Sequence, residues 1–240
     1  MIDEGLSLGR LICTFLARPG CVWVKTDSVI REFRSAMVEN LKSAIQYWFT
    51  GIVKPVETFR RFQSNENKLQ ISLWIVLLFS FMYAITAYFL YRVGILPAIE
   101  PWIPISEERY YLYQAFWTIP WGLVTAIMMG GVAHIMAVLG RRYTEQYFFK
   151  DALLVNAMAW VIPSFVFMWL PETFVVSIVR DIPWPGWTEI LRLAVFPVIW
   201  QVVLVVIGMR ETHRVGWVRG ILIAVVVTGL GFLMFLPVMR

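Results

Sequence analysis

The sequence has 240 residues, of which 59% are hydrophobic and only 15% are charged, and its mean hydropathy is +0.68. Because soluble domains carry roughly 25% charged residues, this composition excludes an ordinary water-soluble domain. The formal net charge of +5 does not indicate a nucleic-acid partner. The basic residues lie at the edges of apolar segments, where membrane topology already accounts for them.

Residues 1–68 are predicted to form cytoplasmic helices that are amphipathic and lie at the membrane interface. Within them, apolar residues recur at helical spacing and predict a helix that lies along the lipid headgroups and is broken by Gly51. These positions are Met37, Leu41, Ala44, Ile45, Trp48, Phe49 and Ile52. Pro55 is expected to start the next helix, with Glu57 in its first turn. Both cysteines, Cys13 and Cys21, fall in this region and are expected to be reduced thiols.

Residues 69–240 are predicted to form a polytopic helical bundle, because five segments without Asp, Glu, Lys or Arg reach bilayer length. The segments cover approximately residues 69–91, 117–139, 152–171, 193–209 and 220–239. In lipid, such a segment must satisfy its own backbone polar groups, so each is expected to be a helix. The fold class is therefore all-α, with five transmembrane helices. Pro120, Pro163 and Pro197 are expected to kink them.

Lysine and arginine indicate which side of the membrane each loop occupies, because they accumulate on the cytoplasmic side. Ten fall in the flank before the first segment and in the loops after the second and fourth, against five in the other loops and at the C-terminus. The N-terminus is therefore predicted to be cytoplasmic and the C-terminus outside. A bacterial inner membrane is the expected location.

Polar residues inside the predicted spans are the candidate functional residues, because each is costly in hydrocarbon. Gly122, Ala126, Gly130 and His134 recur every four residues on one helical face, where small side chains permit close helix approach. This face, together with Asn156 and Gln201, is the candidate intramembrane polar and packing site. His134 is interpreted either as a proton-responsive or ligand-contacting residue or as a neutral histidine that makes one interhelical hydrogen bond.

The sequence lacks the motifs of several enzyme classes. Its two histidines and two cysteines form no zinc-binding pattern. The sequence also contains no P-loop and no G-x-S-x-G elbow. No predicted span carries Asp or Glu, which argues against an intramembrane carboxylate dyad. No catalytic residue, cofactor or metal is predicted.

The run Pro55-Val-Glu57-Thr58-Phe59 just ahead of the first span resembles a motif of the Yip-domain family, in its prokaryotic form. The resemblance extends from about Trp48 to Met239 and includes five spans that end near the C-terminus. It implies a non-enzymatic membrane protein that shapes membranes or recruits partners. Eukaryotic relatives are associated with Rab GTPases, but this chain lacks their Asp-Leu-Tyr-Gly-Pro run. Rab binding is therefore not implied.

Three functions remain open at this stage. The leading hypothesis is a membrane organiser or scaffold that recruits partners at the cytoplasmic face. The alternative is a transporter or channel for ions or small solutes with a midplane site near His134. A membrane enzyme would need catalytic groups in the loops, such as Glu107, Glu108, Asp181 or Glu189. The expected partners are the lipid bilayer and either a second copy of the chain or other membrane proteins.

Overall fold

The structure is a computed structural model that describes residues 26–97, 104–139, 148–171, 173 and 186–235. The described residues form helices and no strands, which confirms the all-α class. The α-helices are α2 (Thr26–Val53), α3 (Pro55–Gln63), α4 (Lys68–Arg92), α5 (Glu107–Val138), α6 (Phe149–Pro163), α8 (Gly186–Ile190), α9 (Phe196–His213) and α10 (Trp217–Phe235). Cys13, Cys21 and Asp181 lie outside the described residues.

Within the described residues, four helices are long and apolar enough to cross a membrane: Lys68–Arg92, Glu107–Val138, Phe149–Trp169 and Trp217–Met234. The protein is therefore an integral membrane protein in a lipid bilayer. The four helices correspond to four of the five predicted spans. The other predicted span, residues 193–209, falls within a π-helical segment, η2 (Leu191–Val195), and helix α9. Helix α9 is not among the four candidate helices. Its last turns carry Arg210, Glu211 and His213, and these polar residues lower the mean hydropathy of the helix.

Two helices start before the spans that were predicted within them. Helix α5 starts at Glu107, ten residues before the predicted start, because its first turns bury Tyr110 and Tyr111 against the end of α4. Helix α6 starts at Phe149, so the buried side chain of Asp151 lies in its first turn. The candidate helices therefore carry carboxylates ahead of the predicted spans 117–139 and 152–171: Glu107 and Glu108 in α5, and Asp151 in α6.

Two of the three span prolines lie beside π-helical turns. Pro163 ends α6 immediately before η1 (Ser164–Trp169), and Pro197 follows η2 in the first turn of α9. Because proline lacks an N–H group and its ring clashes with the carbonyl four residues earlier, a wider π turn can accommodate it. Pro120, in contrast, lies inside the continuous helix α5.

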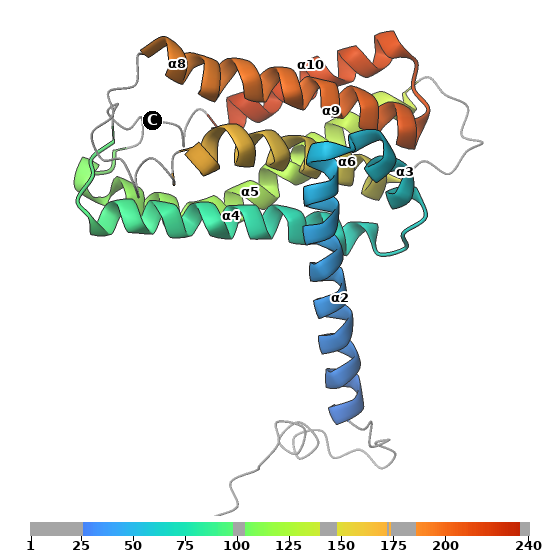
Figure 1. Cartoon of the computed structure of the whole chain (residues 1–240), viewed down its shortest axis with the longest axis horizontal. Helices are drawn as coiled ribbons and strands as arrows, with labels where there is room; N and C mark the ends of the chain where they lie inside the picture. The colour runs from blue at the N-terminus through green and yellow to red at the C-terminus, as the bar shows by residue number, and fades with distance from the viewer. Residues whose placement is uncertain (1–25, 98–103, 140–147, 172, 174–185, 236–240) are drawn as a thin grey trace, which may run out of the picture.

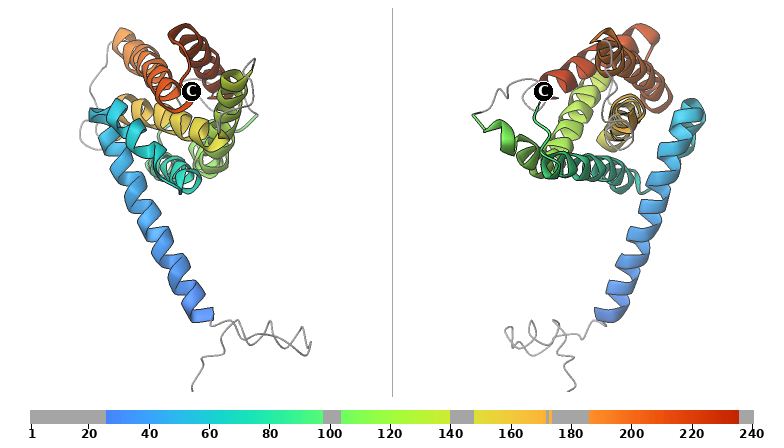
Figure 2. Two further views of the ribbon diagram at one scale, coloured as in Figure 1. Left: turned by 90° about the vertical axis from the view of Figure 1, so that its right-hand side faces the viewer. Right: turned by 60° about the vertical axis from the view of Figure 1, so that its left-hand side comes forward.

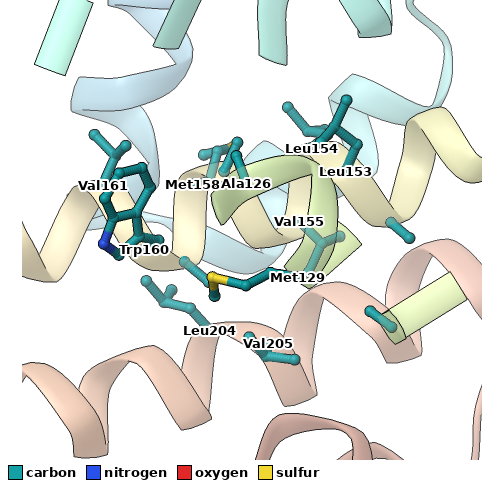
Figure 3. Packing of buried hydrophobic residues seen from close by; sticks show 14 of the residues in the cluster. Ala126, Met129, Leu153, Leu154, Val155, Met158, Trp160, Val161, Leu204 and Val205 are labelled. Carbon is teal, nitrogen blue, oxygen red and sulfur yellow. The ribbon is translucent and has the colours of Figure 1, made fainter. Parts of the chain in front are cut away.

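Helix α6 forms the centre of the bundle. Every residue from Asp151 to Pro163 is buried, as expected for a helix that is apolar on all sides and enclosed by other helices. Figure 3 shows its side chains packed with Ala126 and Met129 of α5 and with Leu204 and Val205 of α9. Helices α4, α5 and α9 contact α6, whereas α10 packs on α9 and α5 (Figure 1).

Helix α2 runs across the long helices of the bundle instead of along them, as the views in Figures 1 and 2 agree. Its second half packs on the bundle through the buried side chains of Ala44 and Trp48. The predicted end at Gly51 was wrong, because α2 continues to Val53. Gly51 is buried, and a Cβ atom there would clash with Met158 of α6. This glycine therefore permits a close helix contact and does not end the helix.

Candidate functional site

The predicted small-residue face of α5 packs against two neighbouring helices. A Cβ atom at Gly122 would clash with the hydroxyl of Ser80 on α4, and one at Gly130 would lie 2.8 Å from the Cα atom of Leu153 on α6. Ala126, between them, is fully buried. Because glycine has no Cβ atom, α5 can approach both helices closely. The described packing of this face is within one chain.

His134, at the end of the same face, lies beside the second histidine of the chain. The ring centroids of His134 and His213 are 5.9 Å apart, and that of Phe149 is 6.2 Å from His134. His213 is fully buried at the end of α9, and its Nδ1 atom is 2.8 Å from the hydroxyl of Thr212. The Nδ1 atom of His134 is buried and has no hydrogen-bond partner among the described residues. The rings of His134 and His213 therefore form a contact between α5 and α9.

Asn156 and Gln201 lie at other contacts. Asn156 is fully buried in α6, where its Nδ2 atom donates to the carbonyl of Ala152 at 2.7 Å. Gln201 lies in α9, where its Nε2 atom is 3.8 Å from the position of a Cβ atom at Gly231 of α10. The six candidate residues therefore form separate contacts and are not gathered in one place.

A buried ion pair joins the first turns of α4 and α6. The Nζ atom of Lys68 donates to the Oδ1 atom of Asp151 at 2.6 Å, and both side chains are only 10% exposed. The hydroxyl of Ser72 donates to the carbonyl of Lys68 at 2.6 Å. Neither Lys68 nor Asp151 is among the candidate residues that the sequence indicates. The available signal was that opposite charges precede two spans that start on the same side of the membrane.

Helix α3 is held against the end of α9 by apolar and charged contacts. Phe59 and Phe62 are buried, and the ring of Phe59 reaches 3.1 Å from the position of a Cβ atom at Gly208. The guanidinium of Arg60 donates to both carboxylate oxygens of Glu211, at 2.7 and 3.3 Å. This hydrogen bond, together with the charge of Glu211, raises the pKa of Arg60 above its ordinary value. Gln63 donates to the backbone carbonyl of Glu211.

The motif from Pro55 to Phe59 has a structural explanation in these contacts. Pro55 begins α3, and the carboxylate of Glu57 accepts a hydrogen bond from Arg61 at 2.6 Å. The hydroxyl of Thr58 donates to the carbonyl of Lys54 at 2.8 Å. Together with the buried ring of Phe59, these residues start, stabilise and dock α3. The motif therefore positions a short helix at the end of the bundle.

The same end of the bundle carries further basic side chains with defined contacts. The Nε and Nη2 atoms of Arg219 donate to the carbonyl of Met136, at 2.9 and 2.6 Å, and Nη2 also donates to Leu139. These carbonyls end α5, where a cation is favourable. Arg210 lies over the ring of Trp217, 3.6 Å from its centroid. Among the described residues, no group of three or more His, Cys, Asp or Glu could hold a metal ion.

Comparison with known proteins gives one result for the family. The model of the Yip1 domain matches residues 50–239, which include α3 to α10 but only the last residues of α2. No curated protein and no solved structure matches the chain.

Proposed function

Because the chain belongs to the Yip1 domain family, we propose that it is a non-enzymatic membrane organiser that recruits partners at its cytoplasmic face. The placement of α2 carries this proposal. Its first half extends away from the bundle, whereas its second half is fixed to the bundle by Ala44 and Trp48 (Figures 1 and 2). A helix with these two halves can anchor to the bundle and still present a surface.

The apolar stripe of α2 continues beyond the part that packs on the bundle. Ile30, Phe33 and Met37 are 62%, 71% and 39% exposed, and their spacing places them on the same face as Ala44 and Trp48. Ser35 and Glu39 lie on the other side of the helix and are also exposed. Because α2 runs across the candidate spans, its axis is parallel to the membrane plane if those spans are normal to it. The lipid that surrounds the bundle therefore provides a surface for the same stripe.

The proposal includes five spans and a defined orientation. The segment from α8 through η2 and α9 forms the fifth span, because α9 begins at the opposite end of the bundle from its contact with α3. The N-terminus is then cytoplasmic and the C-terminus outside, in agreement with the distribution of Lys and Arg. We place the protein in a bacterial inner membrane, with a second copy or other membrane proteins as further partners.

Reconstitution of the full-length chain into liposomes tests this function. We expect vesicles with altered shape in electron cryomicroscopy, because insertion of an amphipathic helix expands one leaflet. A triple variant, Ile30→Glu, Phe33→Glu and Met37→Glu, should leave the vesicles spherical. A matched variant of the polar face, Glu32→Gln, Ser35→Gln and Glu39→Gln, should act as the unmodified chain does. Spherical vesicles with rapid flux of ions or small solutes would contradict the proposal and favour a transporter.

A further inference from the structure

Several polar side chains near the middle of the bundle are buried without hydrogen-bond partners among the described residues. Three of them lie on the facing helices α5, α9 and α10: the hydroxyl of Thr125, the amide Nε2 of Gln201 and the hydroxyl of Thr228. All three side chains are at least nine-tenths buried, with exposed fractions of 0%, 9% and 6%. Because a buried polar group without a partner is costly, each needs an explanation.

The two threonines differ from the other threonines in the helices. A helical threonine can satisfy its hydroxyl by donating to the carbonyl four residues earlier, and several threonines in this chain do so. They are Thr50, Thr58, Thr86, Thr118 and Thr212. Thr125 and Thr228 do not form this bond. Their hydroxyl groups are therefore available to another hydrogen-bonding group.

Two hydrogen bonds set the alignment of α5 and α10. Near one end, the indole Nε1 of Trp121 donates to the carbonyl of Met234 at 2.8 Å, and near the other, Arg219 donates to the carbonyl of Met136. The helices are therefore antiparallel, and interpolation between these contacts places Thr228 level with the turn that follows Thr125. The two hydroxyl groups consequently lie within about one helical turn of each other in depth.

Gln201 reaches the same place from α9. Its Nε2 atom and the Sδ atom of Met129 lie 3.8 and 3.1 Å from one point, the position of a Cβ atom at Gly231. Gly231 follows Thr228 by three residues, and Met129 follows Thr125 by four, so both pairs share a helical face. The absence of a side chain at Gly231 leaves the amide of Gln201 close to α5 and α10.

The geometry points to a hydrated site between α5, α9 and α10, in which Thr125, Gln201 and Thr228 hydrogen-bond one or more water molecules. Two hydroxyl groups and an amide offer donors and acceptors, and a buried water typically makes about three hydrogen bonds. The site carries no formal charge among these residues, so a small neutral hydrogen-bonding molecule is the class of ligand that it fits. This inference does not depend on the role proposed for α2.

Radiolytic hydroxyl-radical labelling of the full-length chain in lipid nanodiscs tests the site, because bound water generates radicals next to the side chains that it contacts. Met129 and Met158 are both 0% exposed, but Met158 lies on α6 against Gly51 and Ile162. We expect Met129 to be oxidised several times faster than Met158. Equal, slow oxidation of both methionines would overturn the proposal.

Variants separate water in this site from general penetration of solvent. Thr228→Val keeps the side-chain volume and removes no hydrogen bond to the described residues, so it should fold and lower the oxidation rate of Met129. Gln201→Leu should lower it further. Thr118→Val, which removes a hydroxyl that is already bonded to the carbonyl of Gln114, should leave the rate unchanged. Rapid oxidation of Met129 that neither Thr228→Val nor Gln201→Leu reduces would also overturn the proposal.

Discussion

Lys68 and Asp151, which lie 83 residues apart in the sequence, form a buried ion pair of 2.6 Å between the first turns of α4 and α6. Desolvation of the two charges offsets much of their attraction, so the pair is weak evidence of net stabilisation. Loss of one partner is different, because it leaves an uncompensated charge beside the apolar centre of the bundle.

Asp151→Ala should therefore lower the free energy of unfolding by about 3–5 kcal/mol. The double variant Lys68→Met, Asp151→Leu should recover most of this loss, since it removes both charges. Thermal unfolding in detergent measures the difference, with the exposed Glu66→Ala as control. An Asp151→Ala chain as stable as the control would show that the pair is not buried in the membrane.

Gly130 and its neighbour Gly131 provide a matched pair for the packing of α5 on α6. A methyl group at residue 130 would meet the backbone of Leu153, whereas at residue 131 the nearest atom, on Phe149, is 4.0 Å away. Gly130→Ala should cost about 1–3 kcal/mol through overpacking. Gly131→Ala should be neutral or slightly stabilising, because alanine favours the helix. Equal thermal midpoints for the two variants would contradict the close approach of these helices.

Phe59 should contribute more than Arg60 to the docking of α3. Phe59 is fully buried, so Phe59→Ala should cost about 3–5 kcal/mol of local stability. Arg60 is exposed and its ion pair with Glu211 is screened by solvent, so Arg60→Ala should cost much less than Phe59→Ala. Hydrogen exchange of the α3 amides reports both losses. Faster exchange in Arg60→Ala than in Phe59→Ala would show that the ion pair, not the ring, holds α3.

If the segment from α8 to α9 is the fifth span, its two ends lie on opposite sides of the membrane. Trp187 and Gly216 are both exposed and lie near these ends. In a chain with Cys13→Ser and Cys21→Ser, a membrane-impermeant maleimide should label Trp187→Cys from outside and Gly216→Cys only after permeabilisation. Labelling of both from one side would show that α9 does not cross.

The apolar runs of the sequence predicted the helices of the bundle because bilayer thickness sets a minimum length for a span. Boundaries were less accurate, since a helix can continue into water where side chains such as Tyr111 find tertiary contacts. The candidate site was predicted only in part. Helical periodicity placed Gly122, Ala126 and Gly130 on one face of α5. Periodicity does not indicate which helices pack against that face. The pairing of Lys68 with Asp151, and of His134 with His213, depends on which helices are neighbours in space.

The depth of α2 in the membrane tests most directly whether this helix acts at the membrane surface. Spin labels at Phe33→Cys and Ser35→Cys, in the chain with Cys13→Ser and Cys21→Ser, can be compared by electron paramagnetic resonance with oxygen and a water-soluble nickel chelate as relaxation agents. We predict that the label at residue 33 relaxes mainly with oxygen, as in lipid, and the label at residue 35 mainly with nickel. Equal, high exposure of both labels to nickel would contradict the account, because α2 would then extend into water.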